Sequence, residues 1–151
     1  MRTIGIRSMP KEVFYAIVET EPLTVVNVDK IKIPLALPTP EALKYLRGHV
    51  LDILREYDVT SACIRITETN AQNLDIQRIQ IEGVLQECFA SSHVSHYFAG
   101  QIANISSKIG IEREQFKKAV EGENLLQVEN WADFKSNERE AVLAAIGAIN
   151  A

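Results

Sequence analysis

The sequence has little cysteine, no long apolar run and no excess of positive charge. Two cysteines among 151 residues exclude a disulfide framework and a cysteine-based four-ligand zinc site. No apolar run approaches the roughly 20 residues of a membrane-spanning helix, and the N-terminus meets charge too early for a secretory leader. The 16 Lys and Arg against 20 Asp and Glu give a formal charge of -4, which argues against a broad, sequence-independent grip on nucleic acid. We therefore expect a cytoplasmic protein with no membrane partner.

Common short motifs of catalysis are also missing. There is no phosphate-binding glycine loop, and no serine or cysteine stands in an evident arrangement with histidine and aspartate. His93 and His96 lie three residues apart around a predicted strand, which would place their rings on opposite faces and makes a shared metal site poor. Cys63 and Cys88 fall on apolar faces, as is typical of buried, inert thiols. These patterns predict no cofactor and no metal site.

What is present is the composition of one globular domain. Hydrophobic residues make up 46% of the chain, and the length fits a single domain over 1–151 with no repeat and no linker. Apolar runs predict three successive strands, at 3–7, 12–19 and 23–33, joined by short turns as an antiparallel meander.

Helices and strands alternate after this meander. Thr39 is the expected N-cap of the first helix, with Pro40 at the first helical position, where its missing N–H is harmless. A long second helix is predicted over 73–91, with Leu74 on its apolar face, and Trp131 and Phe134 are expected to anchor a polar loop at 122–135. The other predicted elements are strands at 61–67 and 94–98, helices at 101–108 and 112–121, and a last helix from Ser136 with Val142, Leu143, Ile146 and Ile149 as its inner face.

This order of elements resembles the ribonuclease H-like fold, and within it the RuvC type of crossover-junction resolvase. The resemblance implies an α/β fold with a mixed five-stranded sheet, in which three antiparallel strands precede alternating helices and strands, flanked by helices. In that family the first strand reads roughly Ile-Gly-Ile-Asp-Pro-Gly, the fourth ends in Ile-Glu, and the last helix opens with two Asp three residues apart. The matching stretches here are Ile4-Gly5-Ile6-Arg7-Ser8-Met9, Ile64-Arg65 and Asn137-Glu138-Arg139-Glu140.

The departures from the family pattern predict an inactive nuclease. Family chemistry is two-metal phosphodiester hydrolysis, in which clustered carboxylates hold Mg²⁺. Mg²⁺ prefers oxygen ligands, whereas this chain has Arg7 and Arg65 where the resemblance expects two carboxylates, and Asn137 with Glu140 at the third pair. Exchanging two carboxylates for two guanidinium groups changes the local charge by about +4, which would repel the metal. We expect a binding or structural module without a catalytic residue.

Two interpretations of Arg7 and Arg65 stay open at this point. They could form internal ion pairs with Glu140, and with Glu138 or Glu68, because two buried like charges need a partner. They could instead converge on a small anion or a nucleic-acid phosphate. The alternative function is a divalent-metal-dependent nuclease whose acids have moved to Glu68, Asp75, Glu138 or Glu140. The basic residues of the 112–121 helix alternate with glutamates, which is typical of a solvated helix rather than a DNA-binding stripe.

A second apolar stripe on the 73–91 helix predicts a protein partner. Its members, Ile76, Ile79, Gly83 and Ala90, lie nearly opposite the inner face of that helix. In the resolvase family the corresponding helix packs against its partner, so the resemblance implies a symmetric homodimer. The alternative is that the final helix or the polar loop covers the stripe within one chain.

Overall fold

Five strands form one mixed sheet in the computed structural model, which describes residues 1–151. The order across the sheet is β3-β2-β1-β4-β5. This order confirms the predicted meander of the first three strands and the predicted mixed five-stranded sheet. β1 pairs antiparallel with β2 and parallel with β4, so it lies in the middle of the sheet. The strands are β1 (Arg2–Ser8), β2 (Glu12–Thr20), β3 (Leu23–Lys32), β4 (Ser61–Arg65) and β5 (His96–Gly100).

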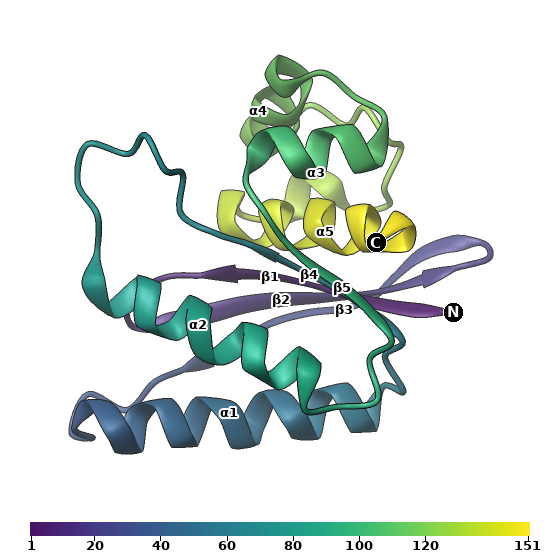
Figure 1. The fold of residues 1–151 in the computed structure, drawn as a ribbon. Coiled ribbons are helices and arrows are strands. Elements are labelled where there is room, and N and C mark those ends of the chain that lie inside the picture. Colours follow the sequence, from purple (N-terminus) through teal and green to yellow (C-terminus); the bar gives the residue numbers. More distant parts are fainter.

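Helices cover both faces of this sheet and make three layers (Figure 1). On one face α1 (Thr39–Glu56) and α2 (Ile76–Ala90) enclose a core with Ile4, Ile6 and Ile64 of the central strands. The other face carries the C-terminal helices, packed over Cys63 in the second core. They are α3 (Ile102–Ile109), α4 (Arg113–Glu121) and α5 (Ser136–Gly147), with short 3-10 turns at Trp131–Asp133 and Ala148–Asn150.

Several predicted boundaries were wrong by one to three residues. Pro38 rather than Thr39 precedes α1 as its N-cap, so Thr39 is already helical. α2 begins after Asp75, whose carboxylate accepts a hydrogen bond from the Arg78 N–H as an N-cap, and Leu74 is left exposed before it. The fourth and fifth strands run over Ser61–Arg65 and His96–Gly100 instead of 61–67 and 94–98, and His93 therefore lies in the loop before β5.

α5 is buried around its whole circumference, where the sequence pattern predicted a single inner face. Every residue from Glu140 to Gly147 is buried, because the sheet covers one side of the helix and α3, α4 and the 122–135 loop cover the other. Trp131 anchors that loop as predicted, since its indole N–H donates to the Ala119 carbonyl at 3.1 Å. Gly5 lets β1 approach α5 closely, because a Cβ there would overlap backbone atoms of Ala141 and Ala145. No helix combines the length and apolar character that crossing a bilayer requires.

Candidate functional site

The alternation of side chains along β1 and β4 directs two arginines toward α5. Thr3 and Ser61 each donate a hydroxyl hydrogen bond to a backbone carbonyl at the C-terminal end of α5 or just after it. Arg7 and Arg65 lie four residues further along these two strands and therefore on the same face. They are register partners in the parallel pair, so both guanidinium groups reach the first turns of α5, near Glu140.

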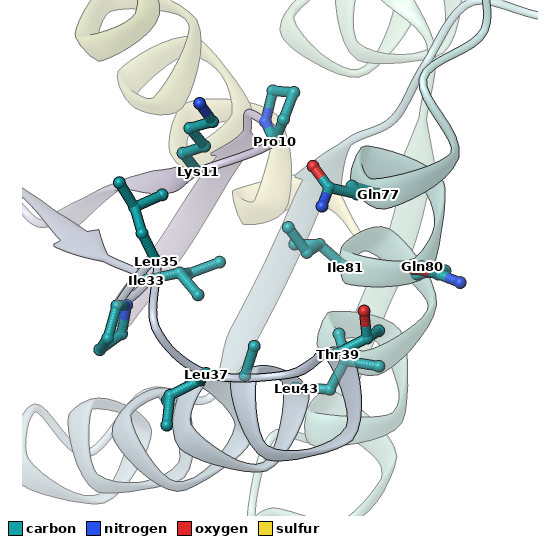
Figure 2. Close-up of a pocket in the computed structure, with 12 residues that line it drawn as sticks. Pro10, Lys11, Ile33, Leu35, Leu37, Thr39, Leu43, Gln77, Gln80 and Ile81 are labelled. Atoms are coloured by element: carbon teal, nitrogen blue, oxygen red, sulfur yellow. The ribbon is translucent and has the colours of Figure 1, made fainter.

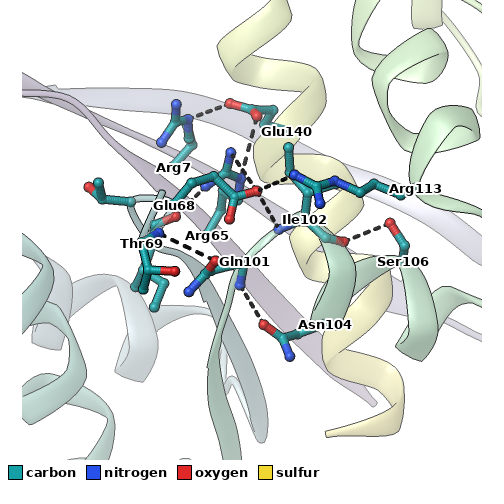
Figure 3. A network of polar contacts seen from close by, with 12 residues as sticks. Arg7, Arg65, Glu68, Thr69, Gln101, Ile102, Asn104, Ser106, Arg113 and Glu140 are labelled. Atoms are coloured by element: carbon teal, nitrogen blue, oxygen red, sulfur yellow. Dashed lines mark hydrogen bonds and ion pairs between the residues drawn. The ribbon is translucent and has the colours of Figure 1, made fainter. Parts of the chain in front are cut away.

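Glu140 places one carboxylate against both arginines (Figure 3). Its Oε2 forms an ion pair with Arg7 Nε, and its Oε1 lies 3.6 Å from Arg65 Nε. The three side chains are 6–12% exposed, so water screens these charges little. One of the two interpretations of the sequence, internal ion pairing of Arg7 and Arg65, is therefore present in the fold.

Glu68 extends this network beyond the end of β4. Its Oε1 lies 3.9 Å from Arg65 Nη2 and 3.8 Å from Arg113 Nη2, and it accepts a hydrogen bond of 3.3 Å from the Ile102 N–H. Arg113 is the first residue of α4, and its side chain is about half exposed. We call Arg7, Arg65, Arg113, Glu68 and Glu140 the arginine cluster (Figure 3).

Burial and charge act in opposite directions on Arg65. Loss of contact with water lowers the pKa of its guanidinium, and the positive charge of Arg7 lowers this pKa further, whereas Glu140 and Glu68 raise it. The two carboxylates thus offset the cost of holding two guanidinium groups side by side. Each carboxylate of the cluster is already engaged by at least one arginine.

A buried carboxylate that the sequence analysis missed lies across the sheet, on α2. Glu82 is 4% exposed and accepts hydrogen bonds from the backbone N–H and hydroxyl of Thr67, from the Ser8 hydroxyl at 3.2 Å and from Arg78 Nε at 3.0 Å. It thereby ties α2 to the carboxyl ends of β1 and β4. The sequence did contain a signal for Glu82. At about 100° per residue Arg78 falls between Leu85 and Phe89 on the apolar face of α2, and a charge on that face needs a partner, which Glu82 provides one turn later.

The other predicted acids are used elsewhere. Asp75 caps α2, and the Glu138 carboxylate accepts a 2.8 Å hydrogen bond from the Lys135 N–H at the start of α5. Asn137 lies one turn before Glu140 in α5; its amide is neutral, and the contacts of the cluster are made by Glu140 instead. No group of three or more His, Cys, Asp or Glu side chains lies close enough to hold a metal ion.

The second apolar stripe of α2 is uncovered. Ile76 is 73% and Ile79 is 42% exposed, and nothing lies within 4 Å of the position that a Cβ of Gly83 would take. The final helix and the polar loop lie on the opposite face of the sheet, so neither covers the stripe, and that alternative was wrong. Ala90, the fourth member, is exposed at the C-terminal end of α2.

Two hollows follow the junction of α1 and α2. The first, of about 100 Å³, opens between α2 and the segment that leads into α1, with Leu35 and Leu37 on one side and Gln77 and Ile81 on the other (Figure 2). The second, of about 460 Å³, is shallower and includes Ile79 and Gly83. Both include Leu43 and Gln80, but only the second contains members of the apolar stripe, and neither contains a residue of the arginine cluster.

Comparison with known proteins gives similarity in structure alone. No protein-family model and no curated protein sequence matches the chain. Thermus thermophilus RuvC in complex with a Holliday junction substrate matches 97% of this chain and 91% of its own, with 15% identity and a TM-score of 0.73. A second Thermus thermophilus RuvC structure matches with 16% identity over 97% of this chain and 92% of its own, and the same TM-score of 0.73. The yeast mitochondrial Holliday junction resolvase Ydc2 matches 98% of this chain and 77% of its own, with 12% identity and a TM-score of 0.61. The chain therefore has the ribonuclease H-like fold in its RuvC-type form.

Proposed function

We propose that this protein is a ribonuclease H-like module that binds a partner and does not cleave nucleic acid. The observation that carries the proposal is the contact of one carboxylate, Glu140, with both Arg7 and Arg65 at the carboxyl ends of the two central strands. Where the resemblance to resolvases expects carboxylates for two metal ions, this chain has guanidinium groups.

The chemistry of the arginine cluster opposes divalent metals. Mg²⁺ and Mn²⁺ bind through oxygen ligands, and a guanidinium offers only donors. Glu140 would have to leave two nearly buried arginines to ligate a metal, and this would leave two positive charges unpaired beside a dication. Nuclease activity through these residues is therefore disfavoured twice, by ligand type and by charge.

A second part of the proposal is a symmetric homodimer through the α2 stripe. Ile76 and Ile79 are among the few large apolar side chains that the fold leaves exposed, and they lie on one side of α2 with Gly83. A glycine with open space above it allows a second helix to approach closely. A two-fold axis near Gly83 would bury the same stripe from both copies, which is how an isologous interface uses one patch.

A cleavage assay tests the proposed function. Branched DNA, single-stranded DNA and an RNA–DNA hybrid are incubated with the protein and Mn²⁺, alongside Glu140→Ala and the matched control Glu138→Ala, which removes a neighbouring carboxylate outside the cluster. We expect no cleavage of any substrate by any of the three proteins. Cleavage by the wild type and by Glu138→Ala that is lost in folded Glu140→Ala would show a relocated metal site and overturn the proposal.

A further inference from the structure

The buried side-chain nitrogens that lack a hydrogen bond are concentrated in the arginine cluster. Of all buried side-chain nitrogen and oxygen atoms, four have no hydrogen-bond partner: Arg7 Nε, Arg7 Nη1, Arg65 Nε and Arg78 Nη2. Three of the four belong to Arg7 and Arg65, and all four are donors. Because buried donors without acceptors are costly and rare, a native protein that has several in one place lacks an acceptor there.

The carboxylates of the cluster cannot supply that acceptor. Glu140 is within ion-pair distance of Arg7 Nε and Arg65 Nε but is aligned for a hydrogen bond with neither, and Arg7 Nη1 has no hydrogen-bond partner. Glu68 already accepts from the Ile102 N–H and faces Arg65 and Arg113 through the same oxygen. An acceptor from outside the chain would satisfy these donors.

The charges of the cluster point the same way. Arg7, Arg65 and Arg113 carry three positive charges, and Glu68 and Glu140 carry two negative charges. Arg7 and Arg65, the two nearly buried guanidinium groups, are balanced by Glu68 and Glu140, so the remaining positive charge is that of the half-exposed Arg113. The cluster as a whole therefore carries one net positive charge on its solvent side, which would attract one further anion.

We propose that the arginine cluster binds one phosphate-type oxyanion. Arg7 and Arg65 would donate to its oxygens from the sheet, and the half-exposed Arg113 would contact it from the solvent side. The proposal rests on the proposed function, because a site that held metal ions would not need this anion. Free phosphate, a phosphate monoester and the phosphodiester of a nucleic acid share the required chemistry, and the experiment distinguishes them.

Thermal unfolding in inorganic phosphate tests the site. Chloride at equal ionic strength is the reference, so that screening alone does not count. A ligand that binds only the folded state raises the melting temperature with its concentration, and we expect this rise for phosphate and not for chloride. The same titration is made on Arg113→Gln and on Lys117→Gln, two positions of α4 with 48% and 47% side-chain exposure, of which only Arg113 contacts the cluster.

We expect Arg113→Gln to weaken apparent phosphate binding about fivefold, since one partly exposed charge-assisted contact is lost. Lys117→Gln should match the wild type within about twofold. Arg7→Lys keeps the charge but removes the Nη1 donor, so it should also weaken binding while the protein stays folded. No phosphate-specific shift in the wild type, or an equal loss in Lys117→Gln, would overturn the site.

Two further probes identify the source of the oxyanion. The dinucleotide dTpdT carries a phosphodiester without a terminal phosphate, and thymidine 5′-monophosphate carries a monoester. Binding of dTpdT that inorganic phosphate displaces would indicate a nucleic-acid backbone, and binding of the monoester alone would indicate a small phosphorylated ligand. Failure of all three probes with no Mn²⁺-dependent cleavage would remove the anion site and leave the proposed function intact. Mn²⁺-dependent cleavage that requires Glu140 would remove both.

Discussion

Arg7 and Arg65 are register partners in the parallel pair of β1 and β4, and their guanidinium groups share the carboxylate of Glu140. The strand register alone would bring two like charges together at the carboxyl ends of the two central strands. Glu140 of α5 offsets the repulsion between these two charges, because its carboxylate pairs with both. The stability of the fold therefore depends on this ion pairing, and loss of the Glu140 carboxylate should lower the free energy of unfolding.

Replacing Glu140 by Gln should destabilise the protein by about 3 kcal/mol, because it leaves two nearly buried guanidinium groups without their carboxylate. Urea denaturation measures the change in the free energy of unfolding. Glu123→Gln, an exposed position outside every ion pair, is the control and should change stability by less than about 0.5 kcal/mol. Equal effects of the two substitutions would contradict the role of Glu140.

Gly5→Ala should destabilise by at least about 3 kcal/mol, because the added methyl group would overlap the backbone of α5 at Ala141 and Ala145. Gly48 of α1 provides the opposite case, since it is exposed in a helix and a Cβ there meets nothing within 4 Å. Gly48→Ala should stabilise by about 0.5–1 kcal/mol. Thermal or urea unfolding of both variants gives the comparison, and a tolerated Gly5→Ala would refute the close packing of β1 on α5.

Ile79→Lys should convert a dimer to a monomer if α2 forms the interface. The matched control is Val26→Lys on β3, because Val26 is 41% exposed and Ile79 is 42% exposed, while only Ile79 lies on the stripe. Sedimentation velocity reports the mass of each protein in solution. A wild type that is monomeric at high concentration, or a dimer that survives Ile79→Lys, would exclude this interface.

The free energy of unfolding should fall as the pH rises from about 9 to 11. Burial raises the pKa of the Cys63 thiol and raises the pKa of Cys88 to about 11, whereas unfolded thiols titrate near 8.5. Above that value the unfolded state releases protons that the folded state retains, so stability is lost by up to about 1.4 kcal/mol per pH unit for each thiol. Burial, followed by the charge of Asp29, raises the pKa of Tyr15 to about 12, which adds a loss above pH 10.

Urea denaturation at pH 8, 9 and 10 measures this slope. Between pH 9 and 10 the free energy of unfolding should fall less steeply with pH in the double variant Cys63→Ala/Cys88→Ala than in the wild type. The same slope in both proteins would mean that other groups control the alkaline loss.

The fold could be predicted from the sequence because its central elements carry strong local patterns. The apolar runs of β1 and β2 predict strands that are buried on both faces, and the helical spacing of Leu46, Val50 and Leu54 predicts one buried face of α1; these residues are buried as predicted. The ends of elements depend on single contacts instead. The hydrogen bond that Asp75 accepts as N-cap makes α2 begin at Ile76 instead of residue 73, and the pattern of apolar residues does not contain this information.

The site could be predicted only in part. Arg7 and Arg65 could be singled out because the resemblance to resolvases expects carboxylates at these two positions, and the ribonuclease H-like order of elements places their strands side by side. Arg113 joins the same cluster from α4 across a long stretch of chain, and its sequence surroundings look like any solvated helix. Long-range pairing of this kind is a property of the packed fold and has no local signal.

Titration of Mn²⁺ by calorimetry tests the central claim that this site holds guanidinium groups in place of metal ions. The account predicts no binding heat for the wild type, and binding for Arg7→Asp/Arg65→Glu, which would place two new carboxylates beside Glu140 and Glu68. Circular dichroism first establishes that the double variant is folded. Binding of Mn²⁺ to the wild type that disappears in Glu140→Ala would contradict the account.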